Sequence, residues 1–221
     1  MVRVYAVVEG QSEEAFIKSV LAPTFHLRGT FITPILLKKT GGDPRWARAR
    51  GDVIRLLKQD QRAYVTTMFD LYALGQDWPG RPPSPIIDGV NAAESIEAAC
   101  LNSVAAEMGD DLCVVKRFFP HVQPYEFEAL LFSNPLALAS SLRAPNAAGH
   151  LQSVRQAFPT PEQINDSPQT APSKRIEQIV GRYDKVLYAA VAGASVGIET
   201  MRIECAHFRA WLERLEALPR T

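Results

Sequence analysis

VRVYAVVEGQSEEAFI, residues 2–17, sets the fold class of this chain. Residues 2–8 are apolar or β-branched on both alternations, which is typical of a strand that is covered on both faces. The apolar residues that follow recur at helical spacing and predict a helix over residues 12–27. A buried strand that runs directly into a helix is the repeating unit of a parallel α/β sheet. Glu9 lies where this strand ends, and a charged carboxylate next to a buried strand requires a structural or functional explanation.

The same alternation of strand and helix continues along the chain. Further strands are predicted over residues 30–37, 63–69 and 112–118, and further helices over residues 45–59 and 90–108. We therefore expect an α/β fold with a mostly parallel, Rossmann-like sheet of about four strands flanked by helices. Residues 134–221 are expected to form a mostly helical C-terminal extension, packed on a core made by residues 1–133.

Composition narrows the classes of function. The chain has 221 residues with 24 Lys and Arg against 24 Asp and Glu, so only local patches could attract nucleic acid. Its 3 cysteines are far apart and form no CxxC motif, which argues against a disulfide framework and a structural zinc site. His121 and His207 have no carboxylate or second histidine at ligand spacing, so packing or hydrogen-bonding roles are expected for both. With no signal peptide or membrane-spanning stretch in view, we expect a cytoplasmic protein without a membrane partner.

Acidic residues follow the predicted strands where parallel sheets bind ligands. Ligands of open α/β sheets bind beyond the carboxyl ends of the strands, a rule that selects Glu9 and Asp70. Glu13 lies one helical turn beyond Glu9, and Glu126 and Glu128 follow the fourth predicted strand. Two acids at this spacing cannot share one helix face, so we expect one of the last pair, preferably Glu126, to point into the site.

Carboxylates that converge in one crevice repel each other unless a cation lies among them. Oxygen ligands without His or Cys suit Mg²⁺ or Mn²⁺ held together with a substrate phosphate. Gly10 would let a phosphate approach the backbone closely, beside a helix N-terminus that favours anions. The alternative is structural, since Glu9 could accept hydrogen bonds from the next helix and Glu13 could simply complement the helix dipole.

Several stretches of the chain together resemble the bacterial family known as domain of unknown function 4276. These stretches are VYAVVEGQSEEAFI (4–17), AYVTTMFDLYAL (63–74), QPYEFEALLFSNP (123–135), INDSPQTAPSKRI (164–176) and CAHFRAWLERLEAL (205–218). The resemblance implies a divergent Toprim-like fold related to the Toprim domains of OLD-type nucleases. It also implies that Glu9 is the general acid/base or metal-linked glutamate, that Glu13 is an added acid, and that Asp70 is the first metal-binding aspartate. Tyr72 stands where the second aspartate is expected.

The resemblance implies a function as well as a fold. It implies a metal-dependent phosphotransfer enzyme, with a nuclease in bacterial anti-phage defence as the leading interpretation, nucleic acid as the substrate and an ATPase as a partner protein. Tyr72 favours the alternative, a catalytically inactive binding or regulatory subunit of an ATPase complex. The choice between DNA and RNA, the number of metal ions and the oligomeric state stay open.

Basic residues provide candidate phosphate contacts. Residues 38–62 hold eight Lys or Arg against three Asp, and Arg48 and Arg55 fall on one helix face away from its apolar stripe. This face is either a surface that contacts a phosphate backbone or an ordinary solvated helix face. Lys174 and Arg175 lie at the start of a late helix, where positive charge opposes the helix dipole. Lys174 is therefore the preferred cation for steadying a phosphate or a transition state.

Overall fold

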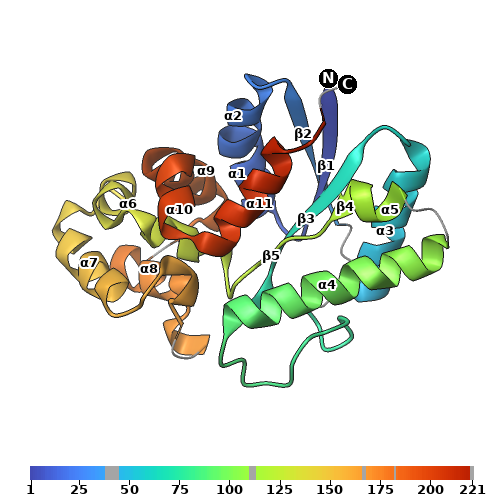
Figure 1. Cartoon of the computed structure of the whole chain (residues 1–221). Coiled ribbons are helices and arrows are strands. Elements are labelled where there is room, and N and C mark those ends of the chain that lie inside the picture. Colours follow the sequence, from blue (N-terminus) through green and yellow to red (C-terminus); the bar gives the residue numbers. More distant parts are fainter. Residues whose placement is uncertain (38–44, 110–112, 166–167, 182, 220–221) are drawn as a thin grey trace.

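The computed structural model describes the chain except residues 38–44, 110–112, 166–167, 182 and 220–221, and it is built around a parallel sheet (Figure 1). The strands are β1 (Val2–Val8), β2 (Thr30–Leu36), β3 (Tyr64–Asp70), β4 (Phe118–Phe119) and β5 (Val122–Gln123). Their order is β2-β1-β3-β4, β5 also pairs with β3, and the described pairs are all parallel. The expected α/β class is confirmed, with five strands in the described part of the chain.

Helices connect the strands and make up the C-terminal part. The first is α1 (Gln11–Phe16), which continues through the π-helical turn η1 (Ile17–Leu21) into α2 (Ala22–His26). The longer helices that follow are α3 (Trp46–Gln59), α4 (Gly89–Met108), α5 (Cys113–Arg117), α6 (Pro135–Ser141), α7 (Ala148–Gln156), α8 (Pro172–Val180), α9 (Lys185–Val196), α10 (Ile198–Glu204) and α11 (Ala206–Glu216). Short 3₁₀ turns are η2 (Leu71–Ala73), η3 (Phe127–Ser133), η4 (Pro145–Ala147), η5 (Pro161–Gln163) and η6 (Pro168–Thr170).

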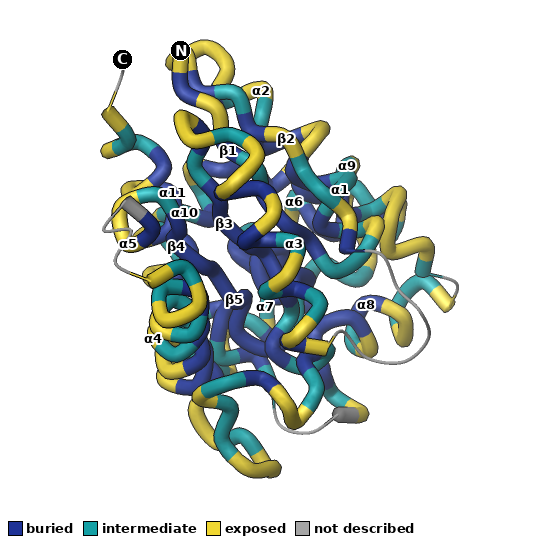
Figure 2. The backbone as a smooth tube through the Cα atoms, turned by 90° about the vertical axis from the view of Figure 1, so that its right-hand side faces the viewer, coloured by how far each residue is buried: buried dark blue, intermediate teal, exposed yellow. Residues whose placement is uncertain are grey.

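The sheet separates two hydrophobic cores. In β1, Val4, Ala6 and Val8 face one core, whereas Val7 faces the other, as the period-2 geometry of a strand requires. The central strands are accordingly buried, and exposed backbone lies around them (Figure 2). The doubly covered strand predicted from the sequence is therefore present.

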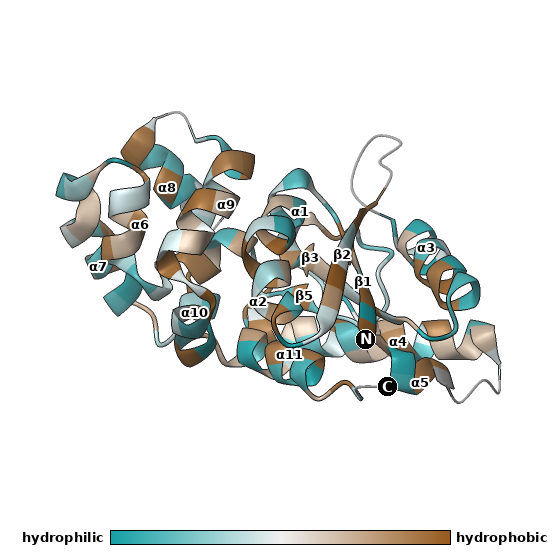
Figure 3. Ribbon diagram, turned by 90° about the horizontal axis from the view of Figure 1, so that it is seen from above, coloured by the Kyte–Doolittle hydropathy of each residue, from teal (hydrophilic) through white to brown (hydrophobic). Residues whose placement is uncertain are grey.

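Helices from different parts of the chain cover the two faces. Apolar residues of α3 and α4 line the core on the Val7 side, and those of α1, α9, α10 and α11 line the core on the other side. The hydropathy of the residues follows this division, since brown and teal residues alternate around α3 and α11 while the strands are largely brown (Figure 3). The core on the α1 side contains residues from both the strands and the C-terminal helices, and Trp211 of α11 donates from Nε1 to Thr66 Oγ1 of β3 at 2.8 Å.

Close packing fixes the position of α9 against α1. A Cβ atom built on Gly193 of α9 would lie 2.9 Å from Cδ2 of Phe16, closer than side chains tolerate. Glycine therefore lets the two helices approach each other. Glu13 lies on α1, and α9 begins at Lys185. The contact between the two helices therefore also sets the spacing between the start of α1 and the start of α9 at the sheet edge.

The strand predicted over residues 112–118 is largely wrong. Residues 113–117 form α5, and only Phe118 and Phe119 pair with β3. Val114 is buried while Val115 is 54% exposed, a pattern that does not suit a strand covered on both faces. Arg117 instead donates to the carbonyl oxygens of Leu57 and Ala63, so tertiary contacts override the β propensity of the valines.

Among the described residues, no single helix is both long and apolar enough to cross a membrane. The consecutive helices α9 and α10 meet that test only when taken together, and they are bent by 80° at their junction.

Candidate active site at the sheet edge

Parallel pairing brings the ends of β1 and β3 together. Val8 pairs with Met68, so Glu9 and Asp70 follow at the same carboxyl edge of the sheet. Asp70 Oδ1 accepts a hydrogen bond of 2.8 Å from the backbone N–H of Phe127, the first residue of η3. The aspartate is therefore held from two sides, by its own strand and by the turn that carries the next acids.

Glu13 folds back toward the strand that precedes its helix. Its Oε2 accepts a hydrogen bond of 2.9 Å from the backbone N–H of Gly10, which precedes α1. The residue is only 5% exposed. A Cβ atom on Gly10 would lie 2.9 Å from the same Oε2, so glycine leaves room for this carboxylate. The role predicted for Gly10, close approach of a phosphate, remains a prediction.

Glu126 and Glu128 both reach the site, which contradicts the expectation that only one would do so. Glu126 is an extended residue that precedes η3, and Glu128 lies within that turn, so the two are not neighbours on one regular helix. Lys185 Nζ lies 3.4 Å from Glu128 Oε1 and 4.0 Å from Glu126 Oε1. Glu128 is the more buried of the two acids, at 1% exposure.

Lys185 is the cation that the fold brings to these acids, and sequence reasoning missed it. It is the first residue of α9, and the side chain of Asp184 caps that helix by accepting from the backbone N–H of Leu187 at 3.1 Å. The cap fixes where the helix starts and therefore where Lys185 lies. Lys185 opposes the dipole of α9 as Lys174 opposes that of α8, but no pattern in the sequence placed a helix start at Asp184 or brought it to the distant acids.

Ser173 lies in the first turn of α8 and binds Glu126. The helix has Ala171 as its N-cap and Pro172 in its first turn. The Ser173 backbone N–H donates to Glu126 Oε2 at 2.9 Å, and its Oγ donates to Oε1 at 3.1 Å. Both oxygens of Glu126 are thereby oriented by α8.

Burial, with crowding of negative charge, explains the ionisation of the site. Burial is the main cause of the rise in the pKa of Glu13 to about 7, and the charges of Glu9 and Glu128 contribute to that rise. Burial also raises the pKa of Asp70 well above its usual value, with Glu13 and Glu128 adding to the effect. Burial raises the pKa of Glu128 even though Lys185 acts against it. One lysine therefore offsets only part of the negative charge that these acids bring together.

The same crowding acts on Lys185 in the opposite sense. Burial lowers its pKa, but the charges of Glu128, Glu126 and Asp70 outweigh burial and raise the pKa overall. Lys185 is thus a protonated cation at neutral pH. Below, the acidic site means Glu9, Glu13, Asp70, Glu126, Glu128 and Lys185.

Other predicted phosphate contacts lie in different surroundings. Lys174 Nζ pairs with Glu177 Oε2 at 2.7 Å on an exposed part of α8. Arg175 donates from Nε to the Thr170 carbonyl oxygen at 2.7 Å and lies over the Phe158 ring. Arg55 pairs with Asp52 at 2.8 Å on α3, and Arg48 is half-buried on the same helix. Part of the basic segment, residues 38–44, lies outside the described residues. The phosphate-binding roles of Arg48, Arg55, Lys174 and Arg175 stay predictions.

Tyr72 does not bring a carboxylate to the acidic site. It lies in η2, its backbone N–H donates to the Tyr125 carbonyl oxygen at 3.1 Å, and the two rings are 5.3 Å apart. Burial raises the pKa of the Tyr72 hydroxyl. Glu126 and Glu128, from the turn that Asp70 binds, supply the further acids of the site.

His121 and His207 also have partners that sequence spacing did not reveal. Glu97 of α4 approaches both rings, and the ring centroids lie 5.0 Å apart. The expected packing or hydrogen-bonding roles of both residues stay predictions, but sequence spacing did not show that a carboxylate and a second histidine lie beside each ring. The fold joins residues that are as much as 110 positions apart.

Three comparisons relate the chain to known proteins. A family model described as "Domain of unknown function (DUF4276)" matches residues 8–216. Among solved structures, the chain is similar to the C-terminal region of the Xanthomonas campestris pv. campestris OLD protein, with 19% identity and a TM-score of 0.46 over 98% of this chain and 95% of that one. No curated protein matches the chain.

Proposed function

This chain belongs to the DUF4276 family, and from that premise we propose that it is a divalent-metal-dependent phosphotransfer enzyme, specifically a nuclease. The observation that carries the proposal is the acidic site, where acids from four segments meet at the carboxyl edge of a parallel sheet beside Lys185. That edge is where open α/β sheets bind their ligands. The Toprim-like character of the sequence motifs supports the same reaction class.

The residues present fit a hard divalent cation. Glu13, Asp70 and Glu128 all have raised pKa values, which means that the site is short of positive charge. Glu128 Oε1 is buried and, among the described residues, has no hydrogen bond of normal geometry, although Lys185 lies 3.4 Å away. The donors are all carboxylate oxygens, the ligands that Mg²⁺ and Mn²⁺ prefer. Glu9, Asp70, Glu126 and Glu128 would hold such an ion, with Glu13 beside them, once their side chains turn toward one another, since among the described residues no three of these acids have ligand oxygens within 4.8 Å of one another.

When bound, a divalent ion at this site would neutralise charge that develops on a transferring phosphoryl group. Lys185 is placed to bind a phosphate oxygen of the substrate by charge and hydrogen bond. Glu13, beside the ion, is suited to accept a proton from an attacking water. Ser173 and Gly10 act on the acids, because their N–H groups hold the carboxylates of Glu126 and Glu13 in place.

A second candidate function rests on Tyr72. Tyr72 stands at the position of an expected second aspartate, and its ring packs against Tyr125. This substitution favours a regulatory, non-cleaving subunit. From the sequence resemblance we also propose an ATPase partner and a role in anti-phage defence, whether the protein is a nuclease or a regulatory subunit. Both a nuclease and a regulatory subunit could bind nucleic acid, but only the nuclease needs the acids to hold a catalytic ion.

The experiment is a cleavage assay with plasmid DNA, single-stranded DNA and RNA, each with Mg²⁺, Mn²⁺ or EDTA. Asp70→Asn is the test variant, since its remaining oxygen still accepts from the Phe127 N–H. We expect metal-dependent cleavage by the wild type and a loss of about 100-fold or more in the variant. Glu14→Gln is the control, because Glu14 lies on α1 beside Glu13 but pairs with Lys18 at 2.6 Å. Absence of cleavage on all three substrates would favour the regulatory subunit instead. Full activity of Asp70→Asn would show that cleavage does not depend on the acidic site.

A further inference from the structure

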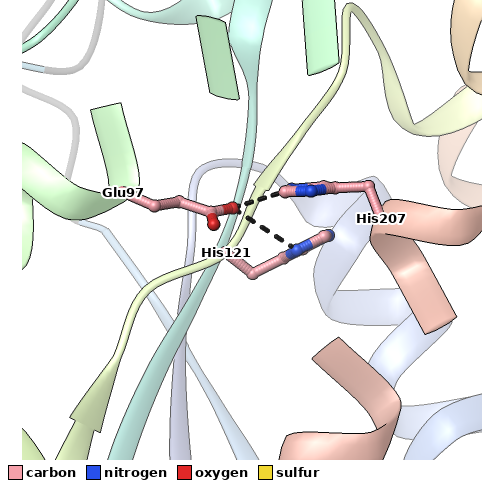
Figure 4. A group of neighbouring side chains, drawn as sticks. All are labelled: Glu97, His121 and His207. Carbon is pink, nitrogen blue, oxygen red and sulfur yellow. Dashed lines mark hydrogen bonds and ion pairs between the residues drawn. The ribbon is translucent and has the colours of Figure 1, made fainter. Parts of the chain in front are cut away.

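A second group of ligand-type side chains lies apart from the acidic site. Glu97 comes from α4, His121 lies between β4 and β5, and His207 is in the first turn of α11 (Figure 4). One potential ligand atom of each residue lies within 4.8 Å of the other two. We refer to Glu97, His121 and His207 as the histidine cluster.

From this geometry we propose that the histidine cluster is a binding site for a transition-metal ion of the Zn²⁺ class. Two histidines and one glutamate are the protein ligands of many zinc sites that keep a fourth position open. Imidazole nitrogen suits Zn²⁺ and its neighbours, whereas the all-oxygen acidic site suits Mg²⁺ or Mn²⁺. The two sites would therefore select different ions within one chain.

The separations of the ligand atoms are close to those of a filled site. His207 Nε2 lies 2.9 Å from Glu97 Oε1, and His121 Nδ1 lies 3.6 Å from the same oxygen (Figure 4). Ligands about 2.0–2.1 Å from one tetrahedral zinc ion lie roughly 3.4 Å apart. Small side-chain rotations would thus be enough to enclose an ion.

The hydrogen bonds of the cluster do not explain why the His121 ring is buried. The residue is 1% exposed, its Nδ1 is beyond hydrogen-bond distance of Glu97, and its Nε2 has no hydrogen-bond partner in the part of the chain that the structure describes. A buried imidazole whose nearest polar neighbour, the Gln123 side chain, makes no hydrogen bond of normal geometry with it is costly. A metal on Nδ1 would leave the proton on Nε2, near the Gln123 amide, whose oxygen also has no partner among the described residues. Metal-bound histidines usually donate their other N–H in this way.

The backbone of the cluster is held in place without a metal. Thr67 Oγ1 accepts from the His121 N–H at 2.9 Å and donates to the His121 carbonyl oxygen at 2.8 Å. Glu162 accepts from the backbone N–H of His207 at 3.0 Å, which fixes the start of α11. Glu97 Oε1 accepts from the Val122 N–H at 2.7 Å. Each ligand is therefore anchored by its own support, as a preformed site requires.

Room for a further ligand lies beside the cluster. A cavity of about 140 Å³ is bordered by all three residues and by Trp211 and Arg214. It is large enough for water or a small anion on the open position.

The test is a Co²⁺ titration of untagged, chelator-treated protein, followed by visible absorption. Four-coordinate Co²⁺ absorbs strongly, unlike octahedral Co²⁺ on carboxylates, so the readout separates the two sites without an activity assay. We expect one Co²⁺ per chain and loss of the band on adding Zn²⁺ but not Mg²⁺. Quenching of Trp211, whose ring stacks 4.6 Å from His121, should follow the same titration.

Variants decide whether the cluster is responsible. Glu97→Gln keeps an oxygen for the Val122 N–H, and we expect it and His207→Gln to weaken Co²⁺ binding by at least about tenfold. The matched control replaces the exposed His26 and His150, the other two of the 4 histidines, with glutamine and should keep the band. Asp70→Asn should keep it too, which separates this inference from the proposed nuclease. No band with wild type, a band that survives both cluster variants, or one that needs His26 or His150 would overturn the proposal.

Discussion

Replacing Glu13 with glutamine should stabilise the metal-free protein at pH 8 by several times more than at pH 5. Glu13 is buried among other carboxylates, and its pKa is raised from the ordinary value of 4.5 to about 7. Between these values the unfolded chain releases the proton while the folded protein keeps it. A group with a raised folded-state pKa therefore loses stability as pH rises through this window, and the loss is complete above about pH 7.

The size of the effect follows from the two pKa values. At about 1.4 kcal/mol per pH unit, the difference between 4.5 and about 7 is worth about 3 kcal/mol at pH 8. At pH 5 the same linkage leaves about 1 kcal/mol. Glutamine has no charge to desolvate, and its oxygen still accepts from the Gly10 N–H, so Glu13→Gln should recover most of this difference.

Urea unfolding in EDTA at pH 5 and pH 8 measures the effect. Glu14→Gln is the matched control, because Glu14 pairs with Lys18 on the surface and its loss should change the free energy of unfolding by about 0.5 kcal/mol or less. A Glu13→Gln protein no more stable than wild type at pH 8 would refute the reasoning. An equal gain at both pH values would also refute it, since the cause would then not be the charge.

Two further variants test the parts of the acidic site that the sequence did not reveal. Lys185→Ala should reduce metal-dependent cleavage by at least about tenfold, and Lys185→Arg should restore part of it. Lys174→Ala is the control and should have the smaller effect, because Lys174 pairs with Glu177 on the surface. A larger loss with Lys174→Ala would return the role to that residue. Ser173→Ala should lower the free energy of unfolding by about 1 kcal/mol, since it removes the Oγ bond to Glu126 and keeps the backbone one. Unchanged urea midpoints would show that this hydroxyl adds no stability.

The sequence predicted the acids that the sheet itself delivers. Glu9 and Asp70 follow buried strands, and parallel strands end at a common edge, so local patterns were enough to bring them together. Glu13 followed from helical spacing. Helical spacing failed for Glu126 and Glu128, because η3 begins between them and an extended residue precedes it.

Residues contributed by the C-terminal helices could not be predicted in the same way. Lys185 and Ser173 reach the acidic site only because α9 and α8 pack where they do, and no pattern near either residue encodes that packing. The histidine cluster was even harder to predict from the sequence, since its three residues come from three different segments and form no spacing motif. The failed strand over residues 112–118 shows the same limit, because the contacts of Arg117 lie far away in the sequence.

The hydrogen bond between Trp211 and Thr66 has a consequence for how the protein is made. Ribosomes deliver the N-terminal part first, at about 5–20 residues per second, and domains fold as they emerge. An unfinished chain of residues 1–133 would already hold every acid of the acidic site but neither Lys185 nor the helix that closes onto β3. We expect stalled or C-terminally clipped chains to carry this negative charge uncompensated and to be inert. Completion of the C-terminal helices is then required before the acidic site has its full set of side chains.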